Sequence, residues 1–378
     1  MKRREYIAAA DVLRVGSIAL VACFHIWQQS WWNPSFTLGG RYIDFDPLLR
    51  HGYMGVDLLL LLSGFLLYYP WAKRGEPFPD TLDFYKKRLI RILPCYLLAV
   101  GLAFVNALVC GRNAGSAPLW KDLLAHLTFT HTFFARTYLW TSLNGALWTL
   151  CIEMQFYLIF PLVARAFYRK PALTFGIMTA LALLVRLWVM RQAEVSVLFN
   201  QLPCMLDLYA FGMLAAHFLT RNEKNARPGW GWALLSAMFL AGIIFVLYAQ
   251  HPKDNRDIQQ LQMLWRLPLA VLGAGFLYCG ARWPQGLCRA LGSRVTRFLA
   301  AISYNFYMWH QFLAVKLKDW HIPAYVNEMP QMNEGRPWQI KYTVLCFVFA
   351  LAAATLATYL VEKPAARALQ APGKGRSL

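Results

Sequence analysis

The chain has 378 residues, of which 58% are hydrophobic and only 15% are charged, and its mean hydropathy is +0.37. A soluble core cannot hide that much apolar surface, so the composition excludes an ordinary soluble globular protein and indicates a polytopic membrane protein. The net charge of +19 does not require a nucleic-acid partner, because loops that face anionic lipid headgroups carry a comparable basic excess.

Ten apolar runs follow one another along the chain, and most are close to the roughly 20 residues that cross a bilayer as a helix. We therefore predict an all-α fold with about ten transmembrane helices in a single integral-membrane domain, residues 1–378. The helices are expected near residues 9–30, 52–70, 90–110, 143–165, 172–190, 202–219, 229–249, 264–280, 298–315 and 340–361.

The orientation follows from the basic residues between these runs. Well over half of the 38 Lys and Arg residues fall in one alternate set of loops, which includes both ends of the chain. Because cytoplasmic loops carry the excess of Lys and Arg, both termini are predicted to lie in the cytoplasm.

The first run contains two ionisable residues, Arg14 and His25, eleven positions apart. On a helix this spacing puts both side chains on one face, roughly 16 Å apart along the axis. Ionisable groups at bilayer depth are costly, so a functional site is favoured here over purely structural pairing. The fourth run carries Glu153 with Tyr157 one turn later, and the same argument applies to this carboxylate.

Further polar residues interrupt other runs, and each of them can have a structural role in place of a functional one. Ser63 and Gly64 are typical of close helix packing, and buried tyrosines such as Tyr157, Tyr304 and Tyr307 can serve either packing or a cavity. Four histidines outside the apolar runs are expected to be solvated, namely His126, His131, His251 and His321. The eight cysteines have no metal-ligand spacing, so we expect neither a metal site nor a disulfide framework.

A set of short motifs, spread from the first run to the last, resembles the membrane acyltransferase-3 family of bacterial O-acyltransferases. The family's Arg and His separated by ten residues match Arg14 and His25, and its Gly-Val-Asp…Leu-Ser-Gly-Phe-Leu pattern matches residues 55–57 and 62–66. Further matches are Arg88, Arg91, Pro94 and Tyr96; Trp148, Leu150, Glu153, Gln155, Phe156 and Tyr157; Ile302, Ser303, Tyr304, Tyr307 and His310; and Val361, Glu362 and Pro364.

Two features depart from the family pattern. Many relatives have a second acidic residue where this chain has Met154, which puts any mechanism that needs two carboxylates in doubt. Some relatives also append an extracytoplasmic esterase-like domain, whereas this chain ends at Leu378 soon after its tenth run. We therefore expect the stand-alone form, whose chemistry takes place in the membrane domain.

The resemblance implies transfer of an acyl group, most often acetyl, from cytoplasmic acyl-CoA across the bacterial cytoplasmic membrane to a hydroxyl of an extracytoplasmic acceptor. A cell-envelope carbohydrate is the expected acceptor, acyl-CoA is a donor substrate and not a tightly bound cofactor, and no nucleic acid is involved. Residues expected to bind donor or substrate are Arg88, Arg91, Asp57, Trp148, Tyr157, Ser303, Tyr304 and His310.

The chemistry of the residues agrees with this implication. An alcohol needs a base whose pKa lies near the operating pH, and histidine is the natural choice. We expect His25 to be that base, with Glu153 orienting or tuning it. Arg14 is expected to hold the donor or to stabilise a developing oxyanion, because its guanidinium is always charged.

Two other classes of protein remain as alternatives. A proton-coupled transporter or flippase could use Arg14, His25, Glu153 and His310 as a relay, although the sequence shows no matched pair of Gly/Pro-broken helices in two halves. An inactive sensor related to the family is the third possibility, and the intact Arg14 and His25 argue against it.

Overall fold

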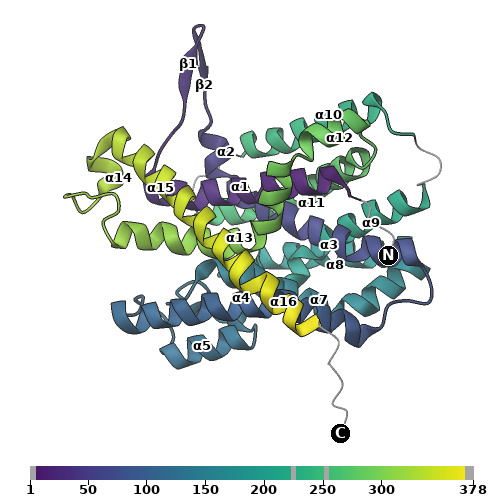
Figure 1. Cartoon of the computed structure of the whole chain (residues 1–378), viewed down its shortest axis with the longest axis horizontal. Helices are drawn as coiled ribbons and strands as arrows, with labels where there is room; N and C mark the ends of the chain where they lie inside the picture. The colour runs from purple at the N-terminus through teal and green to yellow at the C-terminus, as the bar shows by residue number, and fades with distance from the viewer. Residues whose placement is uncertain (1–5, 223–226, 251–254, 371–378) are drawn as a thin grey trace. The chain divides into compact units, whose positions relative to one another are not determined.

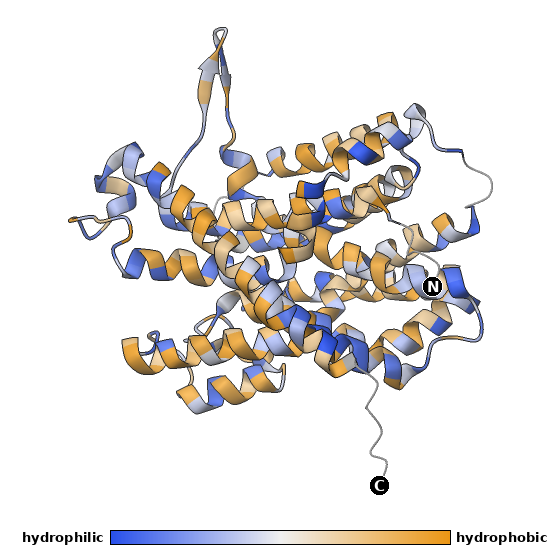
Figure 2. Ribbon diagram, viewed as in Figure 1, coloured by the Kyte–Doolittle hydropathy of each residue, from blue (hydrophilic) through white to orange (hydrophobic). Residues whose placement is uncertain are grey.

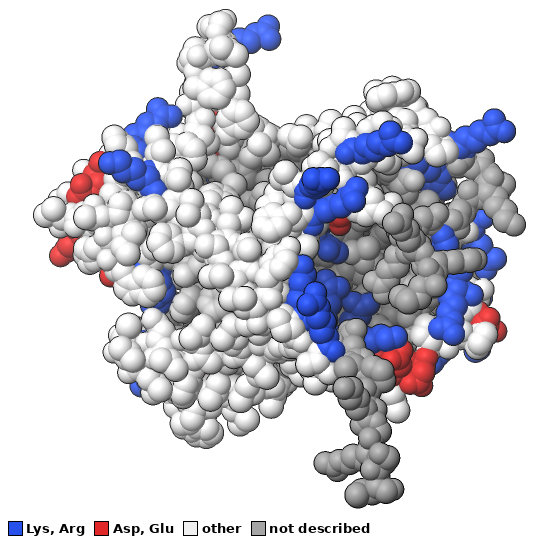
Figure 3. Space-filling model, in the orientation of Figure 1, with Lys and Arg blue, Asp and Glu red and all other residues white. Residues whose placement is uncertain are grey.

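The computed structural model describes residues 6–222, 227–250 and 255–370. Nine helices of this described part are long and apolar enough to cross a membrane, and Figure 2 shows them as largely hydrophobic ribbons. In Figure 3 most of the visible surface carries neither Lys or Arg nor Asp or Glu. The predicted class, a mostly helical polytopic membrane protein, is therefore confirmed.

The chain forms two compact units, and each is discontinuous in sequence. Unit 1 comprises residues 1–78 and 152–300, and unit 2 comprises residues 79–151 and 301–378. That the two work as one functional domain stays a prediction.

Unit 1 contains most of the candidate spans. Its elements are α1 (Ala8–Ser30), β1 (Phe36–Leu38), β2 (Arg41–Ile43), α2 (Asp46–Arg50), η1 (Gly52–Met54), α3 (Gly55–Arg74), most of α7 (Trp148–Arg169), α8 (Pro171–Val189), η4 (Leu202–Met205), α9 (Leu206–Arg221), α10 (Trp230–Tyr248), α11 (Asn255–Gly280), α12 (Gln285–Leu291) and the first turns of α13 (Arg294–Asp319).

Helices α3 and α9 pack closely in the core of unit 1, and two glycines allow the contact. A Cβ at Gly64 would clash with the backbone oxygen of Tyr209, and one at Gly212 would clash with that of Leu61. Small residues let transmembrane backbones approach in this way. The packing role predicted for the Ser63-Gly64 pair is confirmed for Gly64.

The hairpin β1–β2 was not predicted. It pairs Phe36 with Ile43 and Leu38 with Arg41, and Figure 1 shows it extending away from α1 and α2. Its two-residue loop, Gly39-Gly40, has positive φ at both positions, which glycine adopts at little cost and which matches the twist of a tight hairpin.

Unit 2 contains α4 (Thr81–Cys110), α5 (Leu119–Leu127), η2 (His131–Phe133), α6 (Ala135–Tyr138), η3 (Gly145–Leu147), the start of α7, most of α13, α14 (Pro330–Asn333), α15 (Gly335–Leu356), the π-helical segment η5 (Ala357–Glu362) and α16 (Lys363–Gln370). Helix α4 begins nine residues before the predicted run, because its first turns are polar and start at the N-cap Asp80, whose side chain accepts a hydrogen bond from the Asp83 N–H.

Helix α13 corresponds to the predicted ninth span, and it is the one predicted span that is not among the nine candidates in the described chain. It is long enough to cross a bilayer at about 1.5 Å per residue. Its hydropathy is lower because polar side chains interrupt it, among them Ser303, Asn305 and His310. That α13 spans the membrane stays a prediction.

Candidate functional site

Arg14 and His25 both lie on α1, as the spacing predicts, and both are partly buried. The Nδ1 atom of His25 lies 3.0 Å from the backbone oxygen of Val21. A carbonyl oxygen only accepts hydrogen bonds, so Nδ1 is the donor and the neutral ring carries its lone pair on Nε2. Phe24 packs its ring edge-on to His25, with 5.1 Å between the ring centroids. This tautomer is the one that a general base needs if Nε2 accepts the proton.

The other end of α1 holds a cluster that the sequence analysis missed. Asp11 accepts a hydrogen bond from Tyr6 and lies close enough to Arg14 for electrostatic attraction. The Arg297 guanidinium lies over the Tyr6 ring at 4.6 Å and donates from Nε to the Gly292 oxygen at 2.9 Å. Arg14 is therefore one member of a charged group formed by α1 and the start of α13. An acidic residue one turn before Arg14 was the available signal.

Asp57 lies at the start of α3, fully buried and surrounded by donors. Arg266 donates from Nε to Oδ1 at 3.2 Å, and Gln262 donates to Oδ2 at 3.3 Å. Arg266 itself is fully buried, and its other N–H groups reach the Phe199 oxygen at 2.6 Å and the Asn200 side chain at 2.7 Å.

A second buried ion pair joins Arg186 on α8 to Asp207 on α9. Arg186 also donates to the Cys204 oxygen at 2.7 Å. Arg186, Asp207 and Arg266 were not among the predicted residues, although each is a charge inside an apolar run. The cost argument that singled out Arg14 would have found all three.

Two glycines fix the start of α3 against α1. A Cβ at Gly52 would meet the backbone oxygen of Leu20, and one at Gly55 would meet that of Ser17. The first glycine of the Gly-Val-Asp motif is therefore required by backbone contact, and Asp57 follows two residues later. Through this contact the helix that carries His25 is held against the helix that carries Asp57.

Glu153 lies on α7 in unit 1 and is partly buried. It accepts a hydrogen bond from Tyr157 one turn later at 3.2 Å, and its charge acts on the buried Tyr209 of α9. Phe156, on the same helix as Glu153, stacks on Tyr209 with 3.7 Å between the ring centroids. The structure thus places Glu153 and Tyr157 together as predicted from their spacing, whereas an interaction of Glu153 with His25 stays a prediction.

The remaining predicted residues lie in unit 2. Arg88 and Arg91 are on α4, with Arg88 over the Phe84 ring at 5.5 Å and Arg91 attracted to the carboxylate of Glu362. Glu362 also accepts a hydrogen bond from Asn305 at 2.7 Å. The family-like Val-Glu-x-Pro segment therefore meets the basic segment of α4, a contact that the sequence analysis did not predict.

The other predicted residues of unit 2 lie on α13 or near it. Tyr304 donates to the Ile92 oxygen at 3.2 Å, and the ring of His310, fully buried, lies with Nδ1 at 2.7 Å from the Tyr307 oxygen. Asn144 donates to the Met308 oxygen at 2.7 Å, which fixes the loop before Trp148 to α13. Ser303 is buried, and Trp148 packs near Tyr138 with 6.2 Å between ring centroids.

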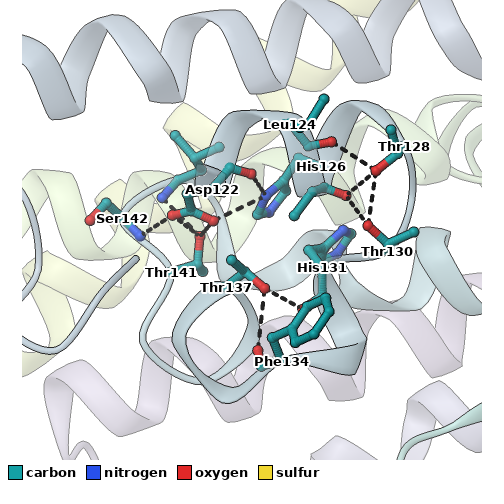
Figure 4. Close-up of polar contacts among 12 residues, drawn as sticks. Asp122, Leu124, His126, Thr128, Thr130, His131, Phe134, Thr137, Thr141 and Ser142 are labelled. Carbon is teal, nitrogen blue, oxygen red and sulfur yellow. Dashed lines mark hydrogen bonds and ion pairs between the residues drawn. The ribbon is translucent and has the colours of Figure 1, made fainter. Parts of the chain in front are cut away.

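The expectation that the loop histidines are solvated is wrong for His126 and His131. Both are buried, and their rings stack with centroids 4.0 Å apart (Figure 4). Asp122 makes this possible, because its carboxylate accepts bonds from Thr141 and the Ser142 N–H and pairs with His126 at 3.3 Å. His321 is exposed as expected, and His251 lies outside the described residues.

The described residues contain no group of three or more His, Cys, Asp or Glu side chains that could hold a metal ion. Unit 1 offers a histidine with its lone pair on Nε2, an arginine on the same helix and the carboxylate of Asp57 on α3, which packs against that helix. These are the groups of acid–base and oxyanion chemistry, carried by a polytopic membrane protein.

Comparison with known proteins agrees with this class. A family model described as an acyltransferase domain matches residues 7–360. The chain therefore belongs to the acyltransferase-3 family, and it is a membrane acyltransferase. No solved structure matches significantly.

Three curated relatives illustrate the match. A putative acetyltransferase, ORF330 of Acidianus two-tailed virus, is 28% identical over 82% of this chain and 83% of its own length. The putative peptidoglycan O-acetyltransferase YrhL of Bacillus subtilis is 25% identical over 96% of this chain, which spans 55% of that relative. The exopolysaccharide production protein ExoZ of Rhizobium meliloti is 29% identical over 69% of this chain and 76% of its own length.

Proposed function

We propose that this protein transfers an acyl group, with acetyl as the first candidate, from acyl-CoA to a hydroxyl of an extracytoplasmic carbohydrate. The relatives' names support an acetyl donor and a cell-envelope glycan acceptor. The bacterial cytoplasmic membrane is the proposed location, with both termini on its cytoplasmic side. The family match supports an acyltransferase over the alternative of a transporter.

The observation that carries the mechanism is the hydrogen bond from His25 Nδ1 to the Val21 oxygen. With the lone pair on Nε2, His25 takes the proton of the acceptor hydroxyl as its oxygen attacks the thioester carbonyl. The C–S bond then breaks, the acyl carbon keeps the new C–O bond, and the departing thiolate of CoA takes the proton from His25. The number of protons is unchanged over the cycle.

Arg14 is proposed to hold the donor or the developing oxyanion. Its guanidinium keeps its charge at any physiological pH and presents several donors in a plane. Asp11 beside it orients the side chain and offsets part of its charge. Arg88 and Arg91 are proposed to attract the phosphates of the donor, since both carry charge near the polar first turns of α4.

The other predicted residues are proposed in supporting roles. Asp57 is proposed to act through its pair with Arg266, which ties the start of α3 to α11 while Gly52 and Gly55 hold it against α1. Glu153 and Tyr157 are proposed to tune His25 or to bind the acceptor, and Trp148, Ser303, Tyr304 and His310 to line the substrate path. Each of these roles is a positioning or binding role, separate from proton transfer by His25.

The test is an assay of the purified protein in detergent with radiolabelled acetyl-CoA and a crude cell-envelope glycan, which follows CoA release and label on the glycan. We expect wild type to transfer label and both Arg14→Ala and His25→Ala to lose transfer. His321→Ala is the matched control, because His321 is exposed. Absence of labelled glycan with wild type, while label is released as free acetate, would overturn the acceptor. Unchanged transfer by His25→Ala would overturn the base.

A further inference from the structure

Helix α5 of unit 2 has its polar residues inside and its apolar residues outside. Asp122 and His126 are fully buried, whereas Trp120, Leu124 and Leu127 are 63%, 54% and 45% exposed. The three exposed residues follow the i, i+4, i+7 spacing of one helix face. In water a helix of this kind would expose its apolar side and bury its charge, which is the reverse of the usual arrangement.

The Asp122 carboxylate on the inward face of α5 is held by several donors, which shows that the orientation is built into the fold. The Asp122 carboxylate accepts hydrogen bonds from Thr141 at 3.0 and 3.1 Å and from the Ser142 N–H at 2.9 Å. Tyr96 of α4 donates to the His126 oxygen at 2.8 Å, and His131 stacks on the His126 ring. Figure 4 shows Asp122 turned toward His126, Thr141 and Ser142, with His131 beside His126. Rotating α5 to hide its leucines would break all of these contacts.

The outward face of α5 continues into other exposed apolar side chains. The segment after α5 exposes four large hydrophobic residues, Phe133, Phe134, Leu139 and Trp140. Helix α4, which packs beside α5, is a candidate membrane span, and toward its C-terminal end it exposes Leu102, Val105, Leu108 and Val109. Figure 2 shows α4 and α5 side by side with largely hydrophobic colouring. The apolar face of α5 thus lies beside a candidate membrane span that exposes apolar side chains of its own.

The length and the flanking charge of α5 fit a helix that lies in one leaflet. Nine residues span about 14 Å, which is too short to cross the hydrocarbon core. The Lys121 ammonium lies over the Trp120 ring at 5.3 Å, so the charged head can reach the interface while the ring stays at the level of the headgroups.

We propose that α5 and the segment that follows it lie in the bilayer, with Leu124 and Leu127 against the acyl chains of the leaflet that the C-terminal end of α4 reaches. The partner is lipid. The buried Asp122–His126–His131 group then provides the polar interior that lets a loop between two spans lie at this depth.

The test is site-directed spin labelling of the full chain in lipid vesicles, with Cys110→Ser, Cys23→Ser and Cys288→Ser in the background because these three cysteines are not fully buried. Labels at Leu124→Cys and Leu127→Cys are compared with Leu108→Cys on α4, a lipid-facing control, and Val326→Cys, which is 96% exposed and serves as the water control. Collisions with oxygen and with a water-soluble nickel chelate are measured at each site.

We expect both α5 sites to collide with oxygen more often than with nickel, as at Leu108→Cys, and to differ from Val326→Cys. A preference for nickel at both sites would place this face in water and overturn the proposal. An immobile label that neither reagent reaches would mean that protein covers this face, which would overturn it as well. Size-exclusion chromatography of each labelled variant confirms that the protein is folded, and the two independent sites guard against a local effect of one label.

Discussion

Two buried carboxylates, Asp57 in unit 1 and Asp122 in unit 2, have different kinds of partner. Asp57 pairs with an arginine 209 residues away in the sequence, Arg266. Asp122 is held by neighbours within 20 residues, and the side chain that pairs with its carboxylate is a histidine, His126. The first arrangement fixes helices of unit 1 against each other, and the second folds a loop of unit 2 onto itself.

Buried charge therefore serves two purposes in this chain. Around Asp57 the ion pair with Arg266 ties α3 to α11, and close glycine contacts hold the start of α3 against α1, which carries His25. Around Asp122 the polar group lets a short helix turn its apolar side outward. We expect stability to fall strongly when Asp57 loses its charged partner, and the group around Asp122 to make stability depend on pH.

The largest effect is expected for Arg266→Leu. This change leaves the Asp57 carboxylate buried without its cation, a loss of about 3–5 kcal/mol in the free energy of unfolding. Denaturant unfolding in detergent measures it. The double variant Asp57→Leu with Arg266→Leu removes both charges and should recover much of the loss, whereas equal instability of the single and double variants would show that packing, and not charge, is lost.

The close approach of α3 and α9 gives the next prediction. Gly64→Ala should destabilise unit 1 by about 1–3 kcal/mol, because an added methyl group meets the Tyr209 backbone and the helices must separate. Gly176→Ala in α8 is the matched control, since nothing lies within 4 Å of its Cβ position, and it should be neutral or slightly stabilising. Thermal unfolding of both variants in the same detergent makes the comparison, and equal behaviour would contradict the packing role.

A smaller effect is expected from the donors to Asp122. Thr141→Val removes a hydroxyl that donates to the buried carboxylate, and we expect a loss of about 1–3 kcal/mol. Thr128→Val, at an exposed threonine of the same loop, should change stability little. Denaturant unfolding of both variants checks this, and a Thr141 variant as stable as wild type would show that this hydroxyl does not stabilise the fold.

The pH response should be the smallest effect. Burial, with the neighbouring His126, lowers the pKa of His131 well below its ordinary value of 6.5. The unfolded chain then binds more protons than the folded one below about pH 6.5, so stability falls as the pH drops from 6.5 toward the folded-state pKa. His131→Asn should flatten this part of the stability profile, and His321→Asn should not. A His131→Asn profile parallel to that of wild type would exclude the contribution.

Local patterns in the sequence predicted much of the fold. Hydropathy gave the spans on α1, α3 and α10 closely, and small residues gave the packing of Gly64. The separation of the chain into two units, and the pairing of Asp57 with Arg266, depend on contacts between distant segments that no local period reveals. The hairpin at Gly39-Gly40 was missed because it lies in the loop between the first two predicted helices, where hydropathy gives no sign of a strand.

The candidate site was predicted in part. Helical spacing was enough to place Arg14 with His25 on one helix and Glu153 beside Tyr157. The same spacing would have found Asp11 one turn before Arg14, but it could not find Arg297, which comes from a distant helix. The buried state of His126 and His131 was missed because a loop position gives no sign that Asp122 and Thr141 enclose it.

The most direct test of the account is chemical rescue of His25→Ala in the labelled acetyl-CoA assay. We predict that the variant loses at least about 100-fold in transfer rate, and that added imidazole restores part of it, with more rescue as rising pH makes imidazole neutral. A His25→Ala variant that transfers acetyl to the glycan at the wild-type rate without imidazole would contradict the central role of His25.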